Sequence, residues 1–395
     1  MPGTCHWLVK QYDGIFKVLF YKDPDTNDDE DVQAKWGGYM HKMSVAFKMT
    51  PLEQLDVIEV GGNRSFIRFA KLVATVLDEL LDKVTPDIVL LDSLTYVPAV
   101  AACGIPWVFI YSPNPLRAYR HLGAPPHFSG YAMNEDPARC DEYRSRRIEV
   151  MKNLKKEYAE WLAERGFTID SEQDIVSPNL NIYTYPSDID YLEFSGVPEG
   201  WHRLDHAMRP VEETAVGIDE NFLKSGEKVI FFSLGSMGGA DVDLMRRLIG
   251  FLSKSRHRFV ISKGPFHDRI DLAPNMVGGK YLNQLKLLPL VDMVINHGGN
   301  NTFVETLYFG KPMIVMPLFG DQHDNGRRAE DKKIGKCLYP NKVTEKELLE
   351  AIDEMLKDDE LIERVAKIGK NMRNSKSGEE LCVKLLKIVQ KGGCT

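Results

Sequence analysis

Cysteine is scarce in this sequence, and its cysteines are not grouped. The 395 residues include six of them, widely scattered: Cys5, Cys103, Cys140, Cys337, Cys382 and Cys394. A zinc ribbon needs cysteine pairs a few residues apart, and a small disulfide-stabilised domain needs a dense set. The spacing excludes both classes, and we expect a reducing compartment.

Long apolar runs and excess basic charge are also lacking. No run approaches the 18 or so apolar residues that a transmembrane helix needs, and the opening MPGTCHWLVKQYDG lacks the pattern of a signal peptide. The sequence therefore predicts a cytoplasmic protein without membrane attachment. A formal net charge of -7 argues against a broad nucleic-acid-binding surface, so that any phosphate site must be local.

The first half of the chain shows the alternation of an α/β fold. Apolar residues keep helical spacing from Phe66 to Val84, and PDIVLLD (86–92) then reads as a buried strand. A short helix in YVPAVAACG, closed by Gly104, precedes a second strand in IPWVFIYS. This is a βαβ unit, and helical spacing returns between 139 and 166.

The alternation restarts in the second half. Its predicted elements are the strand KVIFFSLGS, the helix VDLMRRLIGFLSKS, and the strands RFVISKG, VDMVINHGG and PMIVMPLFG. No periodic element is evident between about 198 and 227, which places a domain boundary there. The length suits two domains of similar size.

Two glycine-bearing turns are candidates for binding phosphate. VDMVINHGGNNTFVETLYFG predicts a strand ending at His297, a Gly-Gly turn and a helix whose N-terminal amides face the carboxyl edge of the sheet. FFSLGSMGG predicts a second such turn, with Ser233 and Ser236, in a neighbouring strand. Each turn alone is equally typical of an ordinary strand-to-helix connection.

The order YLNQ, HGGNNTFVE and PLFGDQHDN between Tyr281 and Asn325 resembles the donor-binding signature of UDP-glycosyltransferases, in particular the small intracellular enzymes of arthropods such as mites. The resemblance implies a GT-B fold, in which two Rossmann-like domains face each other across a cleft. It implies an acceptor-binding domain over 1–205, a UDP-sugar-binding domain over 206–375 and a C-terminal helix over 376–395 that returns to the first domain.

The same resemblance implies roles for individual residues. His297 would meet the diphosphate with Ser236, Gly299, Asn301 and Thr302, and Glu305 would accept the ribose hydroxyls with Gln284 nearby. Tyr281, followed by Leu282, stands where the family usually has tryptophan and would stack on uracil. Asp321 and Gln322 would bind the transferred sugar.

The acceptor-side catalytic pair is incomplete in the sequence. Asp92 matches the aspartate that orients the family's catalytic histidine, but the Gly-His turn after a first strand is absent, as though about 40 opening residues of a family member were lost. His6 precedes an apolar run instead of following one. The other candidates in this half are His41, His121 and His127, the last in an expected acceptor-side loop.

We expect no bound metal. Asp188 with Asp190 and Asp241 with Asp243 superficially match a metal-binding aspartate pair, but Asp241 directly precedes a predicted helix and reads as its N-cap. An imidazole, hydroxyls and a helix N-terminus can neutralise a leaving diphosphate without a cation.

The predicted function is inverting transfer of a hexose, glucose from UDP-glucose, to a hydroxyl of a small lipophilic acceptor by a monomeric enzyme of detoxification. The alternative is a silent UDP-sugar-binding protein or truncated gene product without the catalytic histidine. A dinucleotide oxidoreductase is excluded because the chain has no early G-x-G-x-x-G turn.

Overall fold

The first parallel sheet has the order β1-β2-β3-β4. The computed structural model describes residues 43–392 apart from 95–96, 168–175, 195, 210, 212–216 and 224–225. Within this part the strands of the first sheet are β1 (Val89–Asp92), β2 (Trp107–Tyr111), β3 (Leu180–Thr184) and β4 (Trp201–Leu204). All three neighbouring pairs are parallel, so their carboxyl ends lie at one edge.

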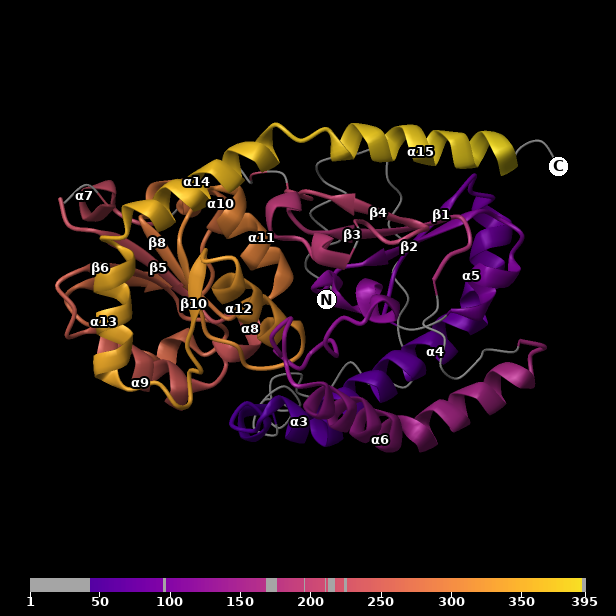
Figure 1. Cartoon of the computed structure of the whole chain (residues 1–395), viewed down its shortest axis with the longest axis horizontal. Helices are drawn as coiled ribbons and strands as arrows, with labels where there is room; N and C mark the ends of the chain where they lie inside the picture. Colours follow the sequence, from indigo (N-terminus) through magenta and orange to yellow (C-terminus); the bar gives the residue numbers. More distant parts are fainter. Residues whose placement is uncertain are drawn as a thin grey trace. The chain divides into compact units, whose positions relative to one another are not determined.

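Helices cover both faces of this sheet (Figure 1). On one face, Trp107, Phe109 and Tyr111 pack against α4 (Val60–Val84) and α6 (Pro137–Ala163). On the other face, Val108, Leu180 and Ile182 pack against Leu381, Leu385 and Ile388 of α15 (Ser377–Gly392). The alternation of β2 between these faces explains why its sequence is continuously apolar.

The second parallel sheet has the order β10-β9-β8-β5-β6-β7. Its strands are β5 (Val229–Ser233), β6 (Arg258–Ser262), β7 (Met276–Gly279), β8 (Met293–Asn296), β9 (Met313–Val315) and β10 (Gly335–Cys337). Every pair is parallel. Both sheets belong to one compact unit, Met40–Thr395. The predicted α/β fold class is confirmed.

The remaining helices alternate with the strands. They are α3 (Pro51–Gln54), which a π-helical turn joins to α4, α5 (Pro98–Ala102), α7 (Glu220–Leu223), α8 (Gly235–Gly238), α9 (Val242–Leu252), α10 (Gln284–Leu287), α11 (Asn300–Tyr308), α12 (Asp321–Asp331), α13 (Glu345–Met355) and α14 (Asp359–Arg373).

Local sequence fixes where several helices begin. Asp136 caps α6 by accepting from the Ala138 amide at 2.9 Å, and proline occupies the first helical position. Thr344 and Glu347 form a reciprocal capping box at the start of α13. Asp241 caps α9 by accepting from the Leu244 amide at 3.1 Å, which confirms the N-cap interpretation of this residue.

The expectation of no regular element between 198 and 227 is wrong. The stretch contains β4 and the short helix α7. The sequence Trp-His-Arg-Leu of β4, an edge strand that pairs with β3, has no apolar run, because His202 and Arg203 make polar contacts with Ser377 and Asp190. Strands β3, β7 and β10 were not predicted either, since strands of three to five residues leave little periodic signal.

Candidate functional site

The two glycine-bearing turns lie side by side. Strands β5 and β8 are neighbours in the second sheet, and Ser233 at the end of β5 pairs in register with Asn296 at the end of β8. Each strand then enters a helix, α8 beginning at Gly235 and α11 capped by Gly299. The predicted adjacency of these turns is therefore confirmed.

The His297 side chain fills the space between the two turns. A Cβ on Gly235 would lie 2.9 Å from its Nε2, and a Cβ on Gly299 would lie 2.5 Å from the same atom. Gly235 also has a φ of +70°, a backbone conformation that residues other than glycine rarely adopt. The imidazole thus requires glycine at both positions, and the backbone conformation requires it at Gly235 as well.

Burial governs the protonation of this histidine. It lowers the pKa of His297 to about 4, so the ring is neutral at pH 7. Its Nδ1 atom is buried and has no hydrogen-bond partner among the described residues. An anion placed against the ring would favour the protonated form, so binding a diphosphate here would be coupled to proton uptake.

The start of α11 presents backbone amides beside this ring. The cap residue is Gly299, which has no side chain that could accept from the amides of the first turn. The exposed side chains of Asn301 and Ser236 and the partly buried Thr302 surround the same turns. A helix N-terminus of this kind suits a phosphate group.

Glu305 lies further along α11 and is buried, with 4% of its surface exposed. It is therefore not a solvent-facing helix residue. Gln284 Nε2 donates to Glu305 Oε2 at 2.5 Å and to Thr302 Oγ1 at 3.4 Å, so these three predicted residues lie together. The carboxylate also accepts from Arg209, which we did not predict because it lies in an aperiodic stretch 96 positions away.

The two predicted base-stacking residues differ in exposure. Tyr281 follows β7 and has 62% of its surface exposed, with Lys280 Nζ located 5.7 Å from its ring centroid. Leu282 is partly buried and packs against a cluster that includes Leu287 and Val294. The Tyr281 ring is thus accessible to a stacking partner.

Asp321 and Gln322 begin α12, directly after Gly320. Asp321 Oδ2 accepts from the Asn114 amide of the first sheet's β2 loop at 3.1 Å, and burial raises the pKa of Asp321 to about 6. Gln322 Oε1 accepts from the Leu318 amide at 2.9 Å and from the Phe319 amide at 3.3 Å. The carbonyl end of Gln322 therefore holds the turn.

A set of buried amide side chains, absent from our predictions, connects the two sheets. Asn300 Nδ2 donates to the Ser112 carbonyl at 2.9 Å and to the Thr184 carbonyl at 3.1 Å. Asn114 Nδ2 donates to Asn325 Oδ1 at 2.7 Å, and Asn325 Nδ2 donates to the Gly298 carbonyl at 2.8 Å. Two of them, Asn300 and Asn325, stand inside the motifs quoted above, which was the available signal.

Asp92 lies at the carboxyl end of β1, and Ser112 holds it. Ser112 Oγ is 2.9 Å from both carboxylate oxygens, and burial raises the pKa of Asp92 above its usual range. Within the described part of the chain, Ser112 supplies the hydrogen bonds that Asp92 accepts, and no histidine does.

Of the four candidate histidines, the structure describes the side chain of His127. His6, His41 and the side chain of His121 lie outside the described residues. His127 is described and is buried, with 5% of its surface exposed. Its Nδ1 lies 3.3 Å from Arg147 Nη1, and the next residue, Phe128, donates its amide to Asp324.

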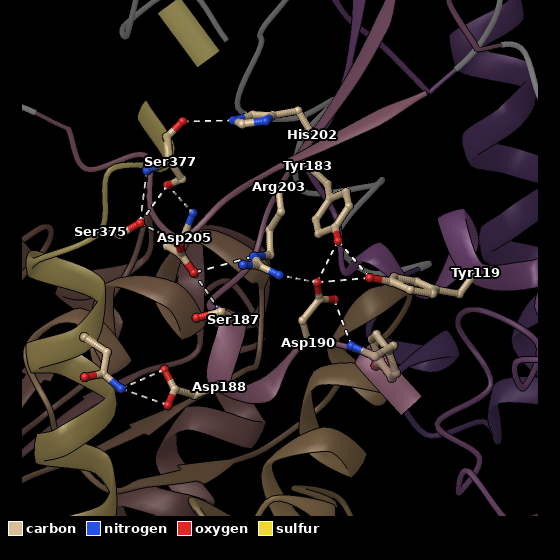
Figure 2. Close-up of polar contacts among 12 residues, drawn as sticks. Tyr119, Tyr183, Ser187, Asp188, Asp190, His202, Arg203, Asp205, Ser375 and Ser377 are labelled. Atoms are coloured by element: carbon tan, nitrogen blue, oxygen red, sulfur yellow. Dashed lines mark hydrogen bonds and ion pairs between the residues drawn. The ribbon is translucent and has the colours of Figure 1, made fainter. Parts of the chain in front are cut away.

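The two suspected aspartate pairs have other partners in the structure. Asp190 accepts from Tyr183 at 2.6 Å and from Tyr119 at 3.0 Å and pairs with Arg203 (Figure 2), while Asp188 accepts from Asn371. Asp241 caps α9. Among the residues that the structure describes, no cluster of three or more His, Cys, Asp or Glu side chains could hold a metal ion.

Comparison with known proteins agrees with this geometry. Residues 209–374 match the family model UDPGT, described as UDP-glucoronosyl and UDP-glucosyl transferase. The matched part contains every predicted donor-site residue and also Arg209. It does not contain Asp92.

Relatives are similar over part of the chain. An uncharacterized UDP-glucosyltransferase of Bacillus subtilis, YdhE, is 28% identical over 167 residues, which are 42% of this chain and 42% of that one. A putative UDP-glucuronosyltransferase of Caenorhabditis elegans, ugt-50, is 33% identical over 125 residues, 31% of this chain and 23% of the other. The chain spans less than half the length of these relatives.

A solved structure shows the fold over most of the chain. The glycotransferase of kitacinnamycin has a TM-score of 0.64 at 22% identity, covering 82% of this chain and 79% of that one. The fold is therefore GT-B, with its two Rossmann-like sheets. None of the described helices is long and apolar enough to cross a membrane.

Proposed function

We propose that this chain is a UDP-dependent glycosyltransferase that transfers glucose from UDP-glucose to a hydroxyl group of a small lipophilic acceptor, with inversion. The acceptor oxygen forms a bond to the anomeric carbon while the bond from that carbon to the diphosphate breaks. UDP leaves, and the acceptor proton passes to a base that Asp92 orients. His297 and the amides of the two turns bind the diphosphate, so no cation is needed.

The observation that carries this proposal is the position of Ser112. Its hydroxyl holds Asp92 at the end of β1, and its carbonyl accepts from Asn300 in the first turn of α11. A single residue thus joins the acceptor-side acid to the predicted diphosphate site. An acceptor hydroxyl near Asp92 would lie close to a sugar whose diphosphate rests on α11.

Other parts of the proposal have narrower support. Glucose as the donor sugar rests on Gln322 beside Asp321 and on the glucosyltransferase relatives, and a lipophilic acceptor on the family resemblance. A monomeric, cytoplasmic enzyme of detoxification, akin to mite-type enzymes, rests on the sequence alone. The proposal that no metal is needed rests on His297 and the backbone amides of the two turns.

The test is transfer from radiolabelled UDP-glucose to simple phenols, with and without excess EDTA. We expect glucoside formation in both conditions. Asp92→Asn should lower turnover by about 10²–10⁴-fold, the usual contribution of a positioned base, with unchanged UDP affinity. Asp188→Asn, an exposed carboxylate bonded to Asn371, is the matched control and should keep full turnover.

Other outcomes would contradict parts of this proposal. UDP binding without any transfer would favour the silent UDP-sugar-binding protein. Loss of UDP affinity in EDTA would show that a cation is required after all. Equal loss of UDP affinity and turnover in Asp92→Asn would place Asp92 in the fold and not in the reaction.

A further inference from the structure

The Glu305 carboxylate is fully engaged by other side chains. Arg209 Nε donates to Oε1 at 3.0 Å and Arg209 Nη2 donates to Oε2 at 3.1 Å, which is a two-point, fork-shaped contact. Gln284 adds a bond of 2.5 Å to Oε2. The side chain of Glu305 is 5% exposed and that of Arg209 is 58% exposed, so Arg209 covers the carboxylate from the solvent side.

Arg209 belongs to the segment that connects the two sheets, between β4 and β5. This segment is anchored at Asp205, which accepts from Ser375 Oγ at 2.6 Å and from the Ser187 amide at 2.6 Å (Figure 2). The ring of His206 packs on Tyr308 of α11, with centroids 4.9 Å apart. These contacts hold the segment against α11, and Arg209 reaches Glu305, which lies about one turn before Tyr308 in this helix.

We propose that Arg209 competes with the ribose of the nucleotide for Glu305 and so limits donor affinity. This inference rests on the proposed function, which assigns the ribose hydroxyls to Glu305. Two neighbouring hydroxyls bind a carboxylate best at its two oxygens, and the Arg209 fork occupies both. The ribose diol therefore has to displace Arg209. Only molecules in which the ion pair is open bind the diol, so the apparent affinity for the nucleotide falls as the paired fraction rises.

The experiment measures the dissociation constants of UDP and 2′,3′-dideoxy-UDP by calorimetry for the full chain and Arg209→Gln. We expect Arg209→Gln to bind UDP about fivefold more tightly, the effect of removing a partly exposed ion pair. The dideoxy nucleotide carries the same diphosphate but no diol, so its affinity should not improve. Arg256→Gln removes a similarly exposed arginine paired with Asp353 and should leave both affinities unchanged.

Further variants separate competition from other effects of the lost charge. In a Glu305→Gln background, Arg209→Gln should give no further gain in UDP affinity, since the carboxylate that both partners need is gone. Arg209→Lys keeps the charge but lacks the fork and should show an intermediate gain. This milder variant also serves if Arg209→Gln folds poorly.

The outcomes distinguish this inference from the function on which it rests. Weaker or unchanged UDP binding in Arg209→Gln, with normal binding by the unaltered chain, would overturn the inference alone. An equal gain for both nucleotides would also overturn it, because the ribose hydroxyls would then play no part. Failure of UDP to bind either protein would overturn both proposals.

Discussion

The imidazole of His297 lies so close to Gly299 that a methyl group on that glycine would stand 2.5 Å from Nε2. Gly299 has an ordinary φ of -59°, so its backbone tolerates alanine. Gly299→Ala should therefore displace the imidazole without straining the turn. We expect UDP affinity to fall about tenfold or more, the loss of one hydrogen bond to a charged group, in a protein that remains folded.

Calorimetry with UDP and circular dichroism would check this expectation together. Gly250→Ala is the control, because a Cβ there meets no atom within 4 Å and the residue lies inside α9. It should leave UDP affinity unchanged and stabilise the fold by about 0.5–1 kcal/mol. Unaltered UDP affinity in Gly299→Ala would show that UDP binding does not depend on where the His297 imidazole lies.

The His297→Ala variant tests which part of the nucleotide this histidine contacts. If its partner is the diphosphate, UDP affinity should fall about tenfold or more while uridine affinity changes little. Binding of UDP by the unaltered chain should also take up protons near pH 6, because an anion favours the charged ring whose pKa burial lowers to about 4. Calorimetry in buffers of different ionisation enthalpy measures this uptake. Equal losses for both ligands would move His297 away from the diphosphate.

Asp321 should select for the sugar. A charge-assisted hydrogen bond to a hydroxyl contributes about 1.5–3 kcal/mol, so Asp321→Asn should weaken UDP-glucose about tenfold and leave UDP unchanged. The pKa of Asp321 is raised to about 6, so the preference of the unaltered chain for UDP-glucose over UDP should shrink as the pH falls from 7 to 5. A preference independent of pH would show that this carboxylate does not hold the sugar.

His323 should make the fold less stable in mild acid. Its side chain is 2% exposed, with Nε2 located 3.0 Å from Gln54 Oε1, and burial lowers its pKa to about 4. Between pH 6.5 and 4 the unfolded chain binds a proton that the folded chain does not, so the free energy of unfolding decreases as the pH falls. At pH 5 this amounts to about 2 kcal/mol.

Urea denaturation of the unaltered chain and of His323→Gln at pH 7.5 and pH 5 provides the comparison. His323→Gln should lose less stability between the two pH values, by about that amount. His267→Gln, in the short helical turn His267–Arg269, serves as the histidine control and should follow the unaltered chain. The same acid loss in His323→Gln as in the unaltered chain would show that His323 titrates normally.

Much of the fold could be predicted from the sequence because long elements carry their own signal. The apolar spacing before Val84 predicted a helix that the structure contains, and the continuous apolar runs around Val108 and Ile230 became buried strands. The order of the motifs around His297 and Asp321 likewise predicted neighbouring strand ends, since parallel strands share a carboxyl edge.

Only the tertiary structure decided which side chains meet across the chain. Arg209 reaches Glu305 over 96 positions and Asn300 reaches Ser112 over 188, and no local pattern encodes a hydrogen bond between such distant residues. The pKa values of His297 and Asp321 likewise depend on burial that distant segments create together. Residue types and spacing determined which groups were available for chemistry, whereas packing decided which of them are neutral, engaged or open to a ligand.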